Sequence, residues 1–211
     1  MNQKGILIVV SGFSGAGKGT LMKELMKRYE ETYALSVSAT TRNPREGEVD
    51  GREYFFKTTE EFEKMIAKAE LIEYAKYVEN YYGTPKQYVE EQLEVGKDVI
   101  LEIEIQGALK VKKAFPDTLL LFVVPPSAQE LEKRLVGRGT ESMDVIASRL
   151  RRAVEESEGM EEYDYLVVND ELELCVEQVH QIIRSEHLKT GRNHAFVENL
   201  KEDLKGLKGE N

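Results

Sequence analysis

The residues GFSGAGKGT, from Gly12 to Thr20, combine glycines with a lysine in an order that suits phosphate binding. They follow the apolar run GILIVVS and precede the amphipathic segment KGTLMKELMKRY, so a strand, a loop and a helix are predicted in that order. In such a loop the backbone N–H groups point at phosphate oxygens and the helix N-terminus adds its dipole. Lys18 supplies a point charge. The stretch is therefore predicted to be a phosphate-binding loop.

One position departs from the usual pattern G-x-x-x-x-G-K-[ST]. Gly19 stands where Ser or Thr is expected, and Thr20 comes one residue later. The loop could be damaged, a chance match, or a variant built for a particular task, although the strand–loop–helix context argues against chance. Because no hydroxyl directly follows Lys18, a Mg²⁺ ion would depend more on phosphate oxygens and water.

A second candidate phosphate site lies in the segment SATTRNPREGEVDGREY. Arg42 and Arg45 stand three residues apart with Pro44 between them, which is not a helical arrangement, and guanidinium groups match phosphate geometry. Alone, the segment would be interpreted as a solvated basic loop. Together with the first loop it predicts phosphoryl transfer between two phosphorylated molecules.

Composition excludes several classes of function. The 211 residues contain 29 Lys plus Arg against 39 Asp plus Glu, a net charge of −10, which argues against nucleic-acid and membrane partners. Cys175 is the one cysteine, so neither an intrachain disulfide nor a cysteine-based metal site is expected. The apolar runs are too short for a signal peptide or a membrane span. A soluble, cytoplasmic protein is expected.

Short apolar runs alternate with helical segments, which predicts an α/β fold with a parallel sheet covered on both faces. Helices are expected after Ser127, whose capping box includes Glu130, over 107–115, and over 170–188. His180, His187 and His194 are expected to be solvated or partly packed rather than metal ligands. The five strand candidates are GILIVVS, YALSVSA, 98–105, 118–124 and 163–169.

Residues 39–95 interrupt this alternation. Asp50-Gly51 indicates a hairpin turn, and a capping box of Thr58 and Glu61 begins a helix. A small antiparallel insertion is therefore predicted here. Residues 137–160 form an arginine-rich helical stretch, and a stripe from Phe196 to Leu207 near the C-terminus could belong to a docked helix, a frayed tail or a partner surface.

Several motifs together resemble the guanylate kinase family. They are SGFSGAGKGT, SVSATTRNPREGEVDGREYFF, FEKMIAKAELIEYA, NYYGTP, LEIEIQGA, PPS…LEKRLVGRGTES and VVND, in the family's order between about Gly5 and His187. Many proteins share the first motif, whereas TTR-x-PR-x-GE and YYGT are more specific. Gly19 is then a family variant, because the ending G-K-G-T resembles the nucleoside monophosphate kinase form of the loop.

The resemblance implies a P-loop three-layer αβα fold with a five-stranded parallel core, an antiparallel GMP-binding insertion and a helical lid. The kinase-like domain would span 5–187, with a C-terminal extension over 188–211. Within it the core would comprise 5–37, 96–136 and 161–187, the insertion 38–95 and the lid 137–160. The implied reaction transfers the γ-phosphoryl of Mg²⁺·ATP to GMP, giving ADP and GDP.

The resemblance also implies site residues. ATP would be bound by Gly12, Phe13, Ser14, Gly15, Ala16, Gly17, Lys18, Gly19, Thr20 and Asn169. GMP would be bound by Ser38, Arg42, Arg45, Tyr54, Glu73, Tyr82, Thr84 and Glu104. The catalytic group would comprise Lys18, Arg42, Arg134, Arg138 and Arg149. Mg²⁺ would lie near Glu102, through water, with Thr20 as a further neighbour.

Physical chemistry supports the carboxylates in this set. Guanine presents adjacent N–H donors on its Watson–Crick edge, where adenine has an acceptor, so a carboxylate such as Glu73 favours guanine. The family commonly has Asp where Glu102 and Glu104 stand, which leaves the division of their roles open. The lid arginines would stabilise charge on the transferring phosphoryl, with Arg151 and Arg152 as lid-surface charges.

Two other functions remain open at this stage. A related kinase could phosphorylate another acceptor, but it would lack the guanine-binding residues that are present here. A non-catalytic binding module is the second alternative, since some scaffold proteins carry guanylate-kinase-like domains with degenerate loops. Lys18 and the matching arginines argue against it. A homo-oligomer is compatible with the sequence, and an interaction through the C-terminal extension over 188–211 also stays open.

Overall fold

The apolar runs of the sequence form a central parallel sheet, because strands covered on both faces have no solvent face for polar side chains. In this computed structural model, which describes residues 4–77, 79–137 and 142–208, the sheet has five strands in the order β2-β7-β1-β8-β9. Every ladder in it is parallel. The strands are β1 (Leu7–Gly12), β2 (Tyr33–Leu35), β7 (Asp98–Glu102), β8 (Leu119–Val124) and β9 (Tyr165–Val168). The predicted α/β class with a five-stranded parallel core is confirmed.

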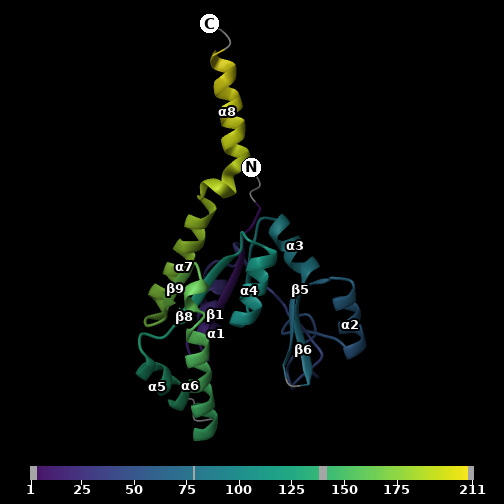
Figure 1. Cartoon of the computed structure of the whole chain (residues 1–211), viewed down its shortest axis with the longest axis vertical. Coiled ribbons are helices and arrows are strands. Elements are labelled where there is room, and N and C mark those ends of the chain that lie inside the picture. The colour runs from purple at the N-terminus through teal and green to yellow at the C-terminus, as the bar shows by residue number, and fades with distance from the viewer. Residues whose placement is uncertain (1–3, 78, 138–141, 209–211) are drawn as a thin grey trace.

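Helices lie on both faces of the sheet (Figure 1), and the side chains between helices and sheet form one hydrophobic cluster on each face. Side chains of β1 alternate between them: Ile8 and Val10 join one cluster, and Leu7 and Val9 join the other, as the two-residue period of a strand requires. The first cluster includes residues of α1 (Lys18–Arg28) and α7 (Leu172–His187). The second includes residues of α3 (Lys86–Glu94) and α4 (Ile105–Ala114). The phosphate-loop segment, between β1 and α1, is thereby anchored on a buried strand.

The insertion forms a second sheet of four strands in the order β4-β3-β6-β5, beside α2 (Thr59–Ala67) (Figure 1). Its strands are β3 (Ala39–Thr40), β4 (Phe55–Phe56), β5 (Leu71–Tyr77) and β6 (Asn80–Pro85). The predicted single strand YALSVSA is in fact two, since β2 joins the core sheet and β3 joins the insertion. The capping box of Thr58 and Glu61 is present with both of its hydrogen bonds.

The hairpin prediction at Asp50-Gly51 is wrong. A turn does occur there, with Gly51 at φ 80°, but β4 pairs in parallel with β3. The other edge of β3 is occupied by β6, which pairs with it antiparallel. The Asp50 carboxylate accepts a hydrogen bond from the Phe56 backbone N–H at 2.7 Å, so the turn fastens the start of β4 and forms no two-strand hairpin. The insertion is therefore a mixed sheet and not a purely antiparallel one.

The arginine-rich stretch forms α6 (Met143–Ser157), which contacts α5 (Ala128–Gly137). Ser127 accepts a hydrogen bond from the Glu130 backbone N–H, as predicted. The Glu130 carboxylate instead contacts Lys133 and Arg134, so the reciprocal half of that capping box is replaced by ion pairs. Arg138 lies outside the described residues.

The histidines of α7 are partly packed, as predicted. The His180 ring stacks on Tyr29 with 3.7 Å between ring centroids, and its Nδ1 lies 2.7 Å from the Tyr33 hydroxyl. His187 Nε2 lies 2.9 Å from the buried Asp98 carboxylate. Within the part of the chain that the structure describes, no cluster of His, Cys, Asp or Glu has the arrangement of a metal site.

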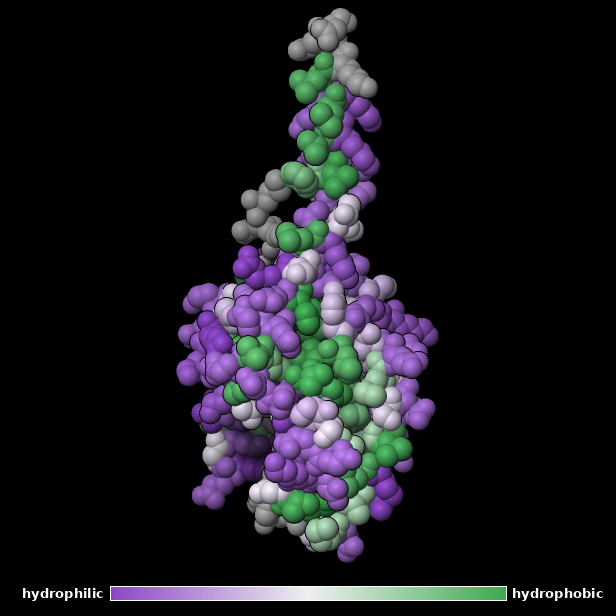
Figure 2. All heavy atoms as spheres, turned by 90° about the vertical axis from the view of Figure 1, so that its left-hand side faces the viewer, coloured by the Kyte–Doolittle hydropathy of each residue, from purple (hydrophilic) through white to green (hydrophobic). Residues whose placement is uncertain are grey.

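The C-terminal extension continues through η2 (Thr190–Asn193) into α8 (His194–Lys208), which projects from the end of the molecule opposite α5 and α6 (Figure 1). Hydrophobic residues follow one another up this helix (Figure 2). The exposed fractions of Phe196, Leu200, Leu204 and Leu207 lie between 46% and 67%. Among the helices of the described ranges, none combines the length and apolar character of a membrane span.

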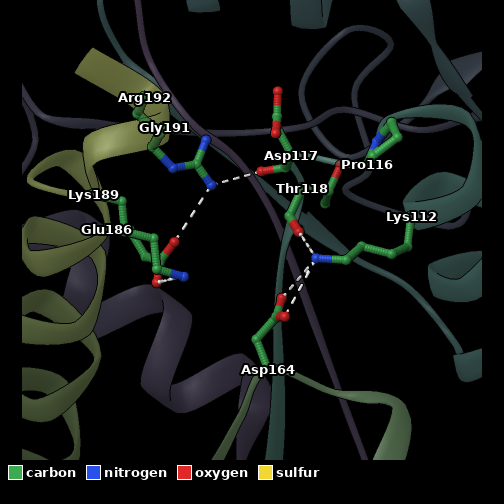
Figure 3. Close-up of a pocket in the computed structure, with 9 residues that line it drawn as sticks. All are labelled: Lys112, Pro116, Asp117, Thr118, Asp164, Glu186, Lys189, Gly191 and Arg192. Atoms are coloured by element: carbon green, nitrogen blue, oxygen red, sulfur yellow. Dashed lines mark hydrogen bonds and ion pairs between the residues drawn. The ribbon is translucent and has the colours of Figure 1, made fainter. Parts of the chain in front are cut away.

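The base of α8 is fastened to the body around a cavity of about 200 Å³ (Figure 3). Glu186, only 1% exposed, pairs with Lys189 at 2.6 Å and with Arg192 at 3.4 Å. Arg192 also donates to the Asp117 carbonyl at 2.6 Å. Burial opposes ionisation of Glu186, but its hydrogen bonds from Lys189 and Tyr165 outweigh this and lower its pKa. These contacts hold the first turn after α7 against the start of β8.

Candidate active site

The predicted phosphate loop connects β1 to α1, and Gly12, Gly15 and Gly17 in it have positive φ angles that other residues rarely adopt. Gly17 has φ 89°, and a Cβ atom there would lie 2.4 Å from the Asn169 side-chain amide. A Cβ at Gly19 would meet nothing within 4 Å. Packing therefore requires Gly17 but leaves open space beside Gly19, at the first turn of α1, where a helix N-terminus favours an anion.

A cavity of about 580 Å³ lies against this loop. Lys18 Nζ donates to the carbonyls of Gly12 and Phe13 at 2.6 and 3.2 Å. Glu102 enters from β7, which is paired with β1 so that Glu102 lies opposite Val10. Burial raises the pKa of the Glu102 carboxyl, and the nearby Lys18 ammonium acts in the opposite direction. The residues lining the cavity are Phe13, Ser14, Gly15, Gly17, Lys18, Gly19, Thr20, Lys23 and Glu102.

Asn169 braces this loop from the end of β9. Its side chain, only 6% exposed as a residue, donates to the Ala16 carbonyl at 2.8 Å. Its own carbonyl accepts from Arg134 Nη1 at 2.9 Å, and Arg134 Nε donates to Glu130 at 2.9 Å. Arg149 of α6 donates to the Ser14 hydroxyl. The structure thus brings Arg134, Arg149 and Asn169 to the phosphate loop.

The second predicted phosphate site is organised around Arg42. Its guanidinium lies 5.3 Å from the centre of the Tyr54 ring, and Nη2 donates to Glu48 at 2.9 Å. The same carboxylate accepts the Arg45 backbone N–H at 2.7 Å. Hydrogen bonds from Arg42 and Arg45 lower the pKa of Glu48. Tyr82, from β6, stands 6.1 Å from Tyr54, centre to centre, so Arg42, Tyr54 and Tyr82 form one cluster.

A half-buried carboxylate lies beside the first turn of α4. Glu73 of β5 accepts a hydrogen bond from the Thr84 hydroxyl at 2.8 Å, and Thr84 is fully buried. A Cβ atom at Gly107 would lie 3.4 Å from Glu73 Oε2. Burial raises the pKa of Glu73, and the hydrogen bond from Thr84 opposes that shift. Such a carboxylate offers lone pairs to a ligand with N–H donors.

Ser38 and Glu104 border this region from two other elements. Ser38 lies between β2 and β3, and its carbonyl accepts from the Phe55 backbone N–H at 2.9 Å. Glu104 directly precedes α4, and its carboxylate pairs with Arg152 of α6 at 2.6 Å. The sequence assigned Arg152 to the surface of the lid, and this contact with Glu104 was not predicted.

A family model described as guanylate kinase matches residues 4–186. The chain belongs to the guanylate kinase family. The resemblance drawn from the motifs is therefore confirmed, and the residues of the two phosphate loops lie inside the matched range.

Curated relatives carry the same family name. The guanylate kinase of Bacillus anthracis is 52% identical over 203 residues, which cover 96% of this chain and 99% of the relative. That of Halalkalibacterium halodurans is 56% identical over 190 residues, 90% of this chain and 93% of the relative. Among solved structures, the guanylate kinase from Anaplasma phagocytophilum matches with a TM-score of 0.71 and 31% identity, covering 90% of each chain.

Two residues of this guanylate kinase family member escaped the sequence analysis. Glu48 holds both Arg42 and the backbone of Arg45, yet in the sequence it is one acidic residue in a polar loop. Its signal was available, because the motif TTR-x-PR-x-GE ends on it. Nothing in the sequence indicates a partner for Arg152, because its ion pair with Glu104, the residue before α4, depends on the tertiary fold.

Proposed function

We infer that the chain is a guanylate kinase that transfers the γ-phosphoryl of ATP to GMP, giving ADP and GDP. The observation that carries this is the presence, in one chain of that family, of a glycine-rich loop with Lys18 and of a separate Arg42–Tyr54–Tyr82 cluster beside the Glu73–Thr84 pair. The first suits a nucleoside triphosphate, and the others suit a phosphate joined to guanine.

On the donor side, we assign the ATP phosphates to the loop from Gly12 to Thr20. Lys18 is held by two loop carbonyls, and phosphate oxygens would replace these acceptors. Arg134 and Arg149 would exchange their contacts with Asn169 and Ser14 for the transferring phosphoryl. Convergent cations stabilise the charge that spreads over its equatorial oxygens. Arg138 is assigned to the same group from the sequence alone.

Asn169 acts on the donor side through the loop. Its side-chain amide already donates to the Ala16 carbonyl, so we assign it to shaping the loop. The adenine contact that the family resemblance implies would then be made by exposed atoms next to Asn169, at the end of β9, and not by the Asn169 amide. Weak selectivity for the donor base follows, because the Asn169 amide is buried and already donates to the loop backbone, so little of it is exposed to a base.

On the acceptor side, we assign the GMP phosphate to Arg42, Arg45, Tyr54 and Tyr82. The guanine base would lie against Glu73 and Thr84, with Ser38 and Glu104 at its border. The ionised Glu73 carboxylate would accept the N–H donors of guanine, whereas adenine would leave it facing a lone pair. Chemistry then consists of in-line transfer with positioning and charge neutralisation, without a covalent intermediate.

The residues at the donor site fit a magnesium ion. Glu102 and Thr20 both line the cavity, and carboxylate and hydroxyl oxygens suit this hard cation. Mg²⁺ usually keeps several water and phosphate ligands, so one or two oxygen donors from the protein are sufficient. When bound, Mg²⁺ would neutralise phosphate charge, with Glu102 reaching it through water.

We place the reaction in the cytoplasm, where a lone buried thiol such as Cys175 stays reduced.

A panel of acceptors tests this function. ADP release from Mg²⁺·ATP should be fast with GMP and at background with AMP, CMP and UMP. Glu73→Gln places an N–H donor against those of guanine, so kcat/KM for GMP should fall by about 10- to 100-fold. Gln87→Glu, on the exposed face of α3, serves as a control with wild-type kinetics. Turnover with another acceptor would overturn the guanine assignment, and GMP binding without turnover would indicate a binding module.

We further propose that α8 packs against a second copy of this chain. A lone helix of this length is marginal in water unless its apolar face is buried. Helical geometry places Lys201 and Asp203 on opposite borders of the Phe196–Leu207 stripe, so two parallel copies bring opposite charges together. Leu200→Glu/Leu204→Glu should lower the molar mass measured by light scattering to that of one chain, 24.1 kDa. A wild-type protein that is already monomeric at micromolar concentration would rule this out.

A further inference from the structure

Helix α6 connects the two proposed substrate sites. Arg149 and Arg152 are three residues apart, so their side chains share one side of the helix. Arg149 contacts Ser14 in the phosphate loop, while Arg152 contacts Glu104, next to the proposed guanine site. One turn of α6 thus contacts both the phosphate loop and Glu104, which lies next to the proposed guanine site.

The Arg152 guanidinium uses different atoms for two carboxylates. Nη2 lies 2.6 Å from Glu104 Oε2, and Nε lies 2.9 Å from Glu156 Oε1 one turn further along α6. Glu156 is the more enclosed of the two, with 20% of its side chain exposed against 66% for Glu104. Glu156 therefore fixes the direction of Arg152, and Arg152 in turn holds the more exposed Glu104.

Glu104 has few other restraints. It is the N-cap residue of α4, but its side chain makes no capping hydrogen bond. Among the described residues, Arg152 is the one side chain that forms an ion pair with it. The backbone on either side of this ion pair is closely packed. A Cβ atom at Gly159 would lie 3.0 Å from Ile105, so the segment after α6 packs against the first residue of α4.

We propose that Arg152 is a positioning residue of the acceptor site, which holds the Glu104 carboxylate oriented toward guanine. The inference rests on the proposed function. A carboxylate has about four lone-pair sites, so Oε2 can accept from Arg152 while the remaining sites accept from guanine N–H groups. Without Arg152, the exposed Glu104 side chain would have to be ordered by GMP itself, and that entropy cost weakens binding.

The test compares KM values for GMP and ATP in variants of this pair. Arg152→Gln should raise KM for GMP by about three- to tenfold, the cost of immobilising one side chain, with KM for ATP unchanged. Arg152→Lys should recover part of the loss. Arg151→Gln, an exposed neighbour on the same helix, should behave as wild type. In a Glu104→Gln background, Arg152→Gln should have no additional effect on KM for GMP.

Several outcomes would overturn the proposal. Equal changes in the two KM values would mean that Arg152 acts on lid closure as a whole, and additive effects of Arg152→Gln and Glu104→Gln would mean that it does not act through Glu104. A lowered unfolding midpoint in Arg152→Gln, with KM for GMP unaltered in Glu156→Gln, would mean a structural role. Failure of the wild-type enzyme to turn over GMP would instead refute the proposed function, so the two failures are distinguishable.

Discussion

Lys18→Ala is expected to reduce kcat by about 10²–10³-fold or more, the usual cost of removing a charge that stabilises the transition state. In the structure Lys18 Nζ is already bound within the loop, to the carbonyls of Gly12 and Phe13, so the ammonium is positioned before ATP arrives. Alanine removes the charge and keeps the helix. The measurement is ADP release with saturating GMP and Mg²⁺·ATP.

Lys27→Ala is the matched control for Lys18, because it removes a lysine from the same helix where 76% of the side chain is exposed. Its kinetics should equal those of the wild type. Lys27→Ala should unfold at the wild-type temperature, and Lys18→Ala slightly below it, because Lys18→Ala loses two hydrogen bonds to loop carbonyls. If Lys18→Ala kept more than a tenth of the activity, the loop would not be the site of the transferring phosphoryl.

Arg42→Ala should raise KM for GMP by about 10- to 100-fold, the range expected for losing a hydrogen bond between charged groups. The guanidinium lies near the rings of Tyr54 and Phe56 and pairs with Glu48. Only 16% of the Arg42 side chain and 18% of the Glu48 side chain are exposed. A phosphate meets a cation that is already oriented. KM for ATP should stay nearly unchanged, because Arg42 belongs to the insertion and not to the donor loop.

Arg52→Ala provides the comparison for Arg42. It removes an exposed arginine of the same insertion, which pairs with the neighbouring Glu53 and donates to the Gly47 carbonyl but does not contact Arg42 or Glu48 in the contacts described. Both KM values should stay at the wild-type level. Equal weakening of GMP and ATP in Arg42→Ala would remove Arg42 from the acceptor site. Direct binding of GMP to the ATP-free protein, measured by calorimetry, separates the effect on affinity from any effect on kcat.

The sequence predicts the core of this fold well because its signals are strong and local. The strand β1 is a continuous apolar run whose side chains alternate between two buried clusters, and the loop after it is fixed by glycines. The two-residue strands β3 and β4 are too short to carry a period. Because β6 occupies one edge of β3, β4 pairs with the other edge, in parallel, and this depends on the tertiary fold.

The same contrast holds for the site. Lys18 and Arg42 belong to motifs whose spacing already indicates their chemistry, whereas the role of Glu73 is implied by the resemblance to the family. Glu48 ends the motif TTR-x-PR-x-GE but received no role from it, and Arg152 belongs to no motif. A carboxylate in a polar loop or an arginine on a charged helix is solvated in most proteins. What distinguishes them is the partner that the fold brings within hydrogen-bond distance: Arg42 for Glu48 and Glu104 for Arg152. Such pairs depend on tertiary structure, and sequence spacing carries little information about them.

The way α8 is attached has a consequence for handling the protein on a surface. The helix leaves the body at the end opposite α5 and α6 (Figure 1), and its base is fixed by Glu186 and Arg192. Local opening of such a segment costs little free energy and stops where buried contacts begin. A label, fusion partner or bead joined beyond Lys208 would therefore pull on α8 alone and leave the catalytic end facing away from the support.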